Sequence, residues 1–474
     1  MEMETGAATG GGEASQSPAP EAEAAESAVE AMKKRFTLNF ATKGWEAEAP
    51  ALLRKYGVLI VRNVFAPEEC TERMNEMIEQ VKIVCPELED EWNDFNAPPG
   101  PRSGLFQNVV GQIPVIWKVR TDERVRHVFE TLYSGLRGKP VTDFVTSCDG
   151  FNLRPYGKPF RKVWSKDWAH LDQTTTPAYP SDPYACIQGQ VVLSDSDACF
   201  RCSPLSIHKF EEISALTREN FVRISGRTGN ELKPGDWNLL KPTQYETVKK
   251  LVEEVGGAWQ IPICEPRGSM IFWMSSTVHS ARIQAERPVP APVPLNPWHG
   301  WRGVVYVCYR PQQEVGPQHF ERLQGCVTNN RCTNHWGKKM FGTSYFRKKF
   351  NPNVTALLKR PLTVYKKHPE LKPEWTPALR ALCFPSPSLS PSPPLSTQKP
   401  VKKKQDFFTV QSTKTARGSF LLPPQQIDVE GSAHSDEGSM TSTIADGVGE
   451  AKASSSSPVL EGDGTVAGER GTEE

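Results

Sequence analysis

The sequence predicts a mainly β fold with flanking helices (α+β), built around two facing sheets of short strands. Helical spacing of apolar residues is confined to two stretches before residue 141. Short apolar strands separated by turn residues then dominate as far as Tyr309. Histidine and aspartate side chains fall at strand positions that a jelly roll, a double-sheet architecture, would gather at its open end.

The two helical stretches are expected to pack on this core. Residues 67–69, Pro-Glu-Glu, open a helix in which apolar residues recur at helical spacing, at Met74, Met77, Ile78 and Val81. Such a stripe is typical of core packing rather than of a ligand site. Arg126, Phe129 and Leu132-Tyr133 indicate a second helix before the strands begin near Val141.

Composition divides the chain into four parts. Residues 1–33 are rich in Ala, Gly and Glu, lack an apolar segment and are too acidic for a transit peptide, so we expect a disordered tail. The double-sheet domain with its N-terminal helices should occupy 34–315. Basic and aromatic residues at 316–375 indicate an extension packed on that core. The Ser/Pro-rich residues 376–474 are expected to be disordered.

A metal site is indicated by Trp-Ala-His-Leu-Asp at 168–172. On an extended strand, His170 and Asp172 point to one side and Leu171 to the other. An imidazole and a carboxylate are two of the three ligands of the facial triad of non-haem Fe(II) oxygenases. The pair alone is weak evidence, so a further ligand is needed.

The third ligand is expected on a later strand. Residues 268–279 read as a turn, an apolar strand and a polar break that ends in His279. Nothing in this pattern needs a histidine for packing, although a surface histidine is the alternative.

A co-substrate anchor is expected on the strand at 300–309, which opens with Arg302. A guanidinium can hold a carboxylate by two parallel hydrogen bonds, which lysine cannot do, and 2-oxoglutarate needs such an anchor. A solvated arginine at a strand entrance is the alternative. Arg282 is the rival anchor, but it lies close to His279 in sequence.

The order His170-x-Asp172, His279, Arg302 resembles the Fe(II)/2-oxoglutarate dioxygenases of the phytanoyl-CoA dioxygenase type. The resemblance covers roughly residues 50–345. Its flanking motifs are the segments 56–70, 149–152, 184–193 and 272–275.

This resemblance implies a double-stranded β-helix (jelly-roll, cupin-like) core and a set of site residues. The implied iron ligands, which are also the catalytic residues, are His170, Asp172 and His279. The implied co-substrate-binding residues are Arg302, Gln188 and Asn152. Fe(II) and the co-substrate 2-oxoglutarate are the implied cofactors, with ascorbate as a further candidate.

The chain also departs from that family. Ala281 stands where a hydroxyl residue often helps to hold the co-substrate, and Gln188 stands where many members carry an aromatic residue. The segment between His279 and Arg302 is longer than usual and rich in proline. These differences leave the iron chemistry intact but leave the substrate class open.

The expected activity is hydroxylation of a small organic substrate, lipid-like or acyl, by dioxygen with release of succinate and CO₂. The carboxylate of Asp172 favours hydroxylation over halogenation, because related halogenases carry a small residue at that position to make room for the halide. The alternatives are the same chemistry on a nucleic acid or a protein, and a non-catalytic relic of the fold that acts as a binding module. A metal enzyme without 2-oxoglutarate would leave Arg302 unexplained.

Basic residues interleaved with aromatics at 336–367 could contact a nucleic acid or the phosphates of a CoA-like substrate. We favour the interpretation that they form the solvated surface of an extension packed on the core, because the net charge is only +1 over 474 residues. The small-molecule substrate is therefore preferred to a nucleic acid. Lys402–Phe408 could be a nuclear-import patch or a docking peptide, and it matches neither pattern fully.

Composition also indicates the compartment. No apolar run has membrane-spanning length and no signal peptide is recognisable, so we expect a soluble protein of the cytoplasm or nucleus. The eleven cysteines are scattered and odd in number, which suits a reducing compartment. Cys199 and Cys202 form a lone CxxC, for which we favour two thiols in a loop over zinc or redox work. The oligomeric state is left open.

Overall fold

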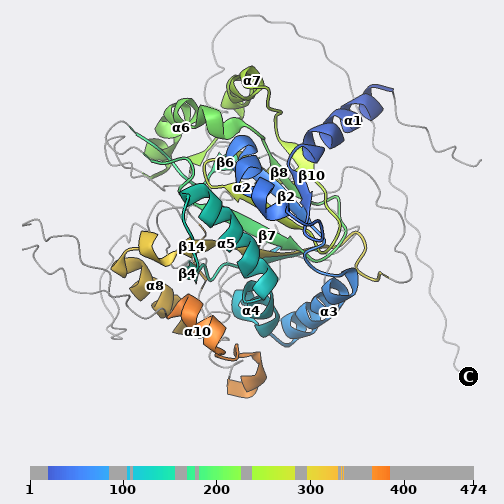
Figure 1. Ribbon diagram of the computed structural model, residues 1–474, viewed down its shortest axis with the longest axis vertical. Helices are drawn as coiled ribbons and strands as arrows, with labels where there is room; N and C mark the ends of the chain where they lie inside the picture. The colour runs from blue at the N-terminus through green and yellow to red at the C-terminus, as the bar shows by residue number, and fades with distance from the viewer. Residues whose placement is uncertain are drawn as a thin grey trace, which may run out of the picture. The chain divides into compact units, whose positions relative to one another are not determined.

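A computed structural model gives the fold (Figure 1). The described residues are 20–84, 104–106, 110–154, 168–176, 181–225, 238–282, 296–328, 332–333, 335 and 366–384. Lys402–Phe408 and most of the basic extension lie outside them.

A seven-stranded sheet forms one layer of the core. Its strands, in spatial order, are β1 (Thr37–Asn39), β2 (Val58–Arg62), β11 (Met270–Met274), β7 (Ile187–Val192), β13 (Arg302–Val307), β5 (Phe151–Arg154) and β3 (Leu105–Phe106). The β1–β2 pair is parallel, and the other pairs are antiparallel.

A five-stranded antiparallel sheet forms the second layer. Its order is β10 (Ile261–Ile263), β8 (Phe200–Cys202), β12 (His279–Ala281), β6 (His170–Leu171) and β9 (Asn238–Leu239). A separate pair joins β14 (Tyr309–Pro311) to β4 (Phe144–Thr146).

Eight of these strands have jelly-roll topology. Along the chain, β5, β7, β11 and β13 lie in the large sheet, while β6, β8, β10 and β12 lie in the small one. The chain therefore crosses between sheets after nearly every strand, which winds two antiparallel layers around one interior. The predicted α+β fold with a double-stranded β-helix core is confirmed.

Helices cover the outer faces of this core. The large sheet shares a hydrophobic cluster with α2 (Trp45–Tyr56), α3 (Pro67–Val84), α4 (Pro114–Arg120) and α5 (Glu123–Arg137). The small sheet shares one with α6 (Phe210–Ser225) and α7 (Tyr245–Glu254). No helix among the described residues is both long enough and apolar enough to cross a bilayer.

Both predicted helices are confirmed, as α3 and α5. The predicted stripe of α3 is buried throughout, at Met74, Met77, Ile78 and Val81. In α5 the apolar residues Phe129, Leu132 and Tyr133 are fully buried. These stripes are core packing, as expected from their spacing.

The N-terminal segment differs from the expectation of a disordered tail, because residues 20–34 form α1 (Pro20–Lys34). Its Ala- and Glu-rich composition favours a helix. Lys33 at its end is buried, and its Nζ lies 2.9 Å from Glu265 Oε1 and 3.2 Å from the Cys264 carbonyl oxygen. Tertiary contacts thus order a segment whose composition alone suggested disorder.

The C-terminal extension also contains described helices. α8 (Pro317–Thr328) and α10 (Pro377–Cys383) share a hydrophobic cluster with Val145 on β4 and with Trp117 on α4. α10 falls inside the segment 376–474 that we expected to be disordered. Its Leu379, Leu382 and Cys383 side chains are buried, so packing against the core again overrides composition.

Candidate metal centre

His170, Asp172 and His279 meet where two neighbouring strands of the small sheet begin or end. His170 opens β6, and Asp172 follows that strand with its backbone N–H donating to the Ser275 carbonyl oxygen at 2.9 Å. His279 opens β12 and lies directly opposite His170 in the antiparallel pairing. The downstream histidine lies on a later strand, as expected, but it opens β12 of the small sheet and does not end the apolar strand β11 (Met270–Met274) of the large sheet.

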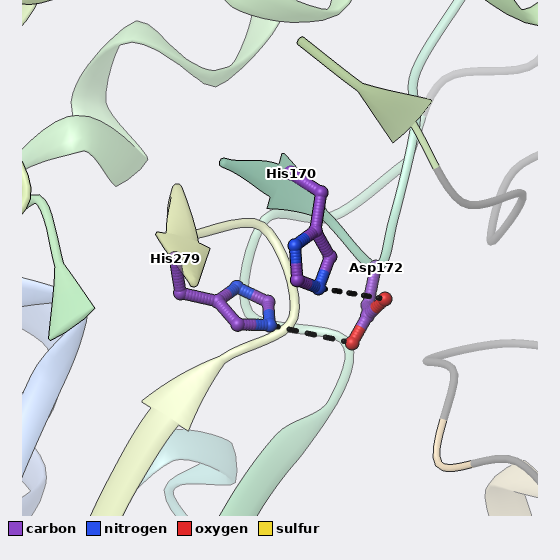
Figure 2. Close-up of side chains that lie close together, drawn as sticks. All are labelled: His170, Asp172 and His279. Carbon is purple, nitrogen blue, oxygen red and sulfur yellow. Dashed lines mark ion pairs between the residues drawn. The ribbon is translucent and has the colours of Figure 1, made fainter. Parts of the chain in front are cut away.

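The donor atoms of these three side chains lie within 4.8 Å of one another (Figure 2). His170 Nε2 is 3.8 Å from Asp172 Oδ1, and His279 Nε2 is 3.5 Å from Asp172 Oδ2. All three side chains are at most 5% exposed. The cluster is a candidate site for a metal ion.

Backbone carbonyl groups fix the orientation of both imidazoles. His170 Nδ1 lies 3.0 Å from the Trp168 carbonyl oxygen, and His279 Nδ1 lies 2.8 Å from that of Thr277. A carbonyl oxygen only accepts, so each Nδ1 carries a proton and donates it, and Nε2 is the ring nitrogen on the Asp172 side. This is the arrangement that outer hydrogen bonds impose on histidine ligands of metals.

The electrostatics of the cluster suit a cation. Burial, and then the neighbouring His279, lower the pKa of His170 to about 3, so its ring is neutral at physiological pH. Burial alone would raise the pKa of Asp172, but hydrogen bonds from His279 and His335 hold it well below its usual range. Asp172 Oδ1 is buried without a hydrogen-bond partner. Two imidazoles, that of His170 neutral, and a carboxylate with such an oxygen fit a divalent metal ion.

Gln188, expected to bind the co-substrate, contacts the carboxylate of the cluster. Gln188 lies on β7 in the middle of the large sheet, and its Nε2 donates a 2.8 Å hydrogen bond to Asp172 Oδ2. The same Nε2 donates to the His335 carbonyl oxygen at 2.9 Å. Gln188 thereby holds one carboxylate oxygen of Asp172.

His335 and Asp149 are site residues that the sequence did not single out. His335 Nε2 lies 3.1 Å from Asp172 Oδ2, and its Nδ1 makes a very short contact with Asp149 Oδ2. Burial alone would lower the pKa of His335, yet Asp149 and Asp172 together raise it well above its usual value. His335 belongs to none of the strand motifs of the sequence, so no pattern pointed to it. Asp149 belongs to the segment 149–152, which was interpreted only as a strand and not as part of the site.

Arg302 opens β13 and faces the interior between the sheets. Its side chain is buried and Nη1 donates to the Ala198 carbonyl oxygen at 2.6 Å. It lines a small cavity together with residues of β7, β8 and β10, among them Gln190 and Phe200. It therefore faces the interior rather than lying solvated at the strand entrance.

A second buried guanidinium, Arg154, lies opposite Arg302 in the β5–β13 pairing. Burial, and then Arg302, lower the pKa of Arg154 to about 9. Two neighbouring guanidinium groups make this part of the interior favourable for an anion. Asn152, the other predicted co-substrate residue, is buried two residues from Arg154 on the same face of β5.

The two cysteines of the CxxC sequence are placed differently in the structure. Cys199 lies close to Cys264, with 3.1 Å between their Sγ atoms, while Cys202 is buried on β8. The strand pairing of β8 with β10 brings Cys199 and Cys264 together, and no disulfide joins any of the described cysteines.

Comparisons with known proteins leave the family unassigned. No protein-family profile matches the chain, and no curated protein matches it. Among solved structures, the hypothetical protein JW0805 from Escherichia coli is similar at 13% identity and a TM-score of 0.43, covering 72% of this chain and 89% of that one. GlcNAc Inducible Gene 2 (DUF1479) from Candida albicans is similar at 13% identity and a TM-score of 0.43, covering 76% and 87%.

The epimerase SnoN, solved with Fe³⁺, alpha ketoglutarate and nogalamycin RO, is similar at 13% identity and a TM-score of 0.30. The match covers 60% of this chain and 84% of that one. Likenesses at this level do not assign a function. The functional argument therefore depends on this chain's own residues.

Proposed function

We propose that this protein is an Fe(II)- and 2-oxoglutarate-dependent dioxygenase that hydroxylates a small organic substrate, lipid-like or acyl. The observation that carries the proposal is the buried cluster of His170, Asp172 and His279, whose potential ligand atoms all lie within 4.8 Å of one another. The phytanoyl-CoA dioxygenase type is the family proposed on the order of motifs.

In this proposal His170, Asp172 and His279 hold the iron, which supplies dioxygen activation when bound with 2-oxoglutarate. Arg302 holds the far carboxylate of 2-oxoglutarate by its guanidinium, and Arg154 adds positive charge beside it. The overall reaction converts 2-oxoglutarate, dioxygen and a C–H bond into succinate, CO₂ and an alcohol. No protein group has to be oxidised or reduced overall.

The chain's own contribution is orientation and exclusion of water. Trp168 stacks on the His170 ring at a centroid distance of 4.4 Å, and Trp273 lies 5.5 Å from the His279 ring. These indoles limit rotation of the imidazoles and shield them from solvent. A buried, preorganised site is what oxidation of an unactivated C–H bond requires from a protein.

The second candidate is the same chemistry on a nucleic acid or protein. Lys366 and Lys367, at the end of the basic stretch, are exposed, which is compatible with contacts to phosphate groups. Alternating basic and aromatic residues upstream of them favour this reading, whereas the near-zero net charge opposes it. The small-molecule reading is therefore preferred.

The test is anaerobic titration of the metal-free protein with Fe(II), followed by succinate release from 2-oxoglutarate in air. His170→Ala and Asp172→Ala should each abolish saturable Fe(II) binding and succinate release while the circular dichroism spectrum is retained. His127→Ala, at a histidine whose side chain is 49% exposed, is the control and should bind Fe(II) as the wild type does. Wild-type affinity in either ligand variant would refute the proposed triad.

A further inference from the structure

The short segment that carries His335 is held by hydrogen bonds to Cys148, which lies between β4 and β5. Thr333 N–H donates to the Cys148 carbonyl oxygen at 3.1 Å, and Cys148 N–H donates to Thr333 Oγ1 at 2.9 Å. Gln112 Nε2 donates to the Cys148 carbonyl oxygen and contacts Cys332 Sγ at 3.2 Å. This reciprocal pairing fixes the segment that follows α8 beside Asp149.

His335 then reaches from this segment into the candidate metal centre. One ring nitrogen contacts Asp149 and the other lies 3.1 Å from Asp172 Oδ2. Its carbonyl oxygen accepts from Gln188, which also donates to Asp172 Oδ2. The backbone and side chain of His335 are thus held by residues that surround a single carboxylate.

The two oxygens of Asp172 have different surroundings. Oδ2 lies within 3.1 Å of Gln188 Nε2 and His335 Nε2, and 3.5 Å from His279 Nε2. Oδ1 is buried without a hydrogen-bond partner and lies on the His170 side. Donors on Oδ2 fix the carboxylate plane, and that plane directs Oδ1 toward His170.

We propose that His335 is a positioning residue of the metal centre, which holds Asp172 Oδ2 so that Oδ1 is available to the metal. The inference rests on the proposed function for the identity of the metal. It also gives the C-terminal extension a function beyond packing, because His335 completes the surroundings of Asp172, the candidate ligand that follows β6. Outer hydrogen bonds to metal ligands typically contribute about 10–100-fold in metal affinity.

Three substitutions separate positioning of Asp172 from attachment of the segment. Glutamine places its amide nitrogen near the position of histidine Nε2, so His335→Gln keeps a donor toward Asp172. Asparagine places its amide nitrogen near that of Nδ1, so His335→Asn keeps the contact with Asp149 only. His335→Ala keeps neither. His368→Ala, at an exposed histidine of the same extension, is the matched control.

The experiment measures dissociation constants for Fe(II) and Co(II) by anaerobic titration, and the melting temperature of each metal-free variant. We expect His335→Ala and His335→Asn to bind both ions about 10–100-fold more weakly. His335→Gln should stay within about threefold of wild type, and His368→Ala should be unchanged. Should the alanine variant fail to fold, the glutamine and asparagine variants still give the comparison.

Wild-type affinity in His335→Ala, or recovery by asparagine rather than glutamine, would overturn the inference. The second result would mean that His335 acts by attaching the segment to Asp149. These outcomes differ from failure of the proposed function, in which the wild-type protein itself would show no binding that depends on His170 and Asp172.

Discussion

Glu265 is the carboxylate on which the docking of helix α1 depends, and replacing it with glutamine should destabilise the protein strongly. Its side chain is fully buried. Lys33 Nζ lies 2.9 Å from Oε1 and Arg62 Nε lies 2.6 Å from Oε2, with Lys33 only 4% exposed and Arg62 40% exposed. Glu265→Gln preserves the shape but leaves the buried ammonium of Lys33 without its main counter-charge.

The expected magnitude follows from burial. Removing one partner of a buried ion pair costs about 3–5 kcal/mol, whereas an exposed pair contributes about 0–1 kcal/mol. Lys33 keeps a hydrogen bond to Glu30 and one to the Cys264 carbonyl oxygen, and Arg62 reaches solvent. We therefore expect the lower end of the range, a loss of about 3 kcal/mol in the free energy of unfolding.

The assay is urea-induced unfolding followed by tryptophan fluorescence. Glu76→Gln is the matched control, because Glu76 pairs with Lys118 at 2.5 Å but is 23% exposed, and it should cost less than about 1 kcal/mol. The double variant Lys33→Met/Glu265→Gln should be more stable than Glu265→Gln, since it removes the uncompensated charge. Equal effects of Glu265→Gln and Glu76→Gln would refute the reasoning.

Three further predictions concern the co-substrate, pH and nucleic acid. Arg302→Lys should weaken the apparent affinity for 2-oxoglutarate about tenfold or more at unchanged Fe(II) affinity, because lysine lacks the guanidinium fork. If Arg282→Lys weakens this affinity and Arg302→Lys does not, Arg282 is the residue that binds the 2-oxoglutarate carboxylate. A bidentate hydrogen bond from Arg124 lowers the pKa of Glu69 to about 2, from 4.5. The pair should therefore stabilise the fold above pH 4.5 and lose this effect as pH falls toward 2. With Glu69 35% exposed, Glu69→Gln should cost about 1 kcal/mol at pH 7, measured by urea unfolding, and the same loss at pH 2 would contradict this. Filter binding should detect no saturable binding of oligonucleotides at physiological salt, whereas tight binding that weakens steeply with salt and depends on residues 338–349 would favour a nucleic-acid substrate.

Much of the fold and the central cluster could be predicted from the sequence because both depend on local periodicity. The alternation of two residues predicts that His170 and Asp172 lie on one side. The apolar run before His279 is strand β11, as predicted, but His279 opens β12 in the other sheet and does not end that run. The helical stripes of α3 and α5 give their buried faces in the same way. These features needed no knowledge of which strands are neighbours.

The rest of the site depends on long-range pairing. His335 reaches Asp172 through a segment with no periodic pattern, and the hydrogen bond from Gln188 to Asp172 joins residues from two different sheets. The order of α1 depends likewise on Glu265, more than 200 residues away in sequence. Local composition carries no information about such contacts, which explains why segment 20–33 was assigned to a disordered tail.

The docking of α1 also has a consequence for self-association. Strand β10 is the outermost strand of the five-stranded sheet among the described residues, and α1 packs against it. An uncovered edge strand presents backbone groups that can pair with another chain, and proteins commonly protect such edges with covering helices, proline or charge. Here α1 supplies the cover and Pro262 removes one backbone donor from the middle of β10. Trimming residues 1–33 as a dispensable tail would thus expose an edge competent for intermolecular pairing, and the shortened protein would aggregate where the longer one does not.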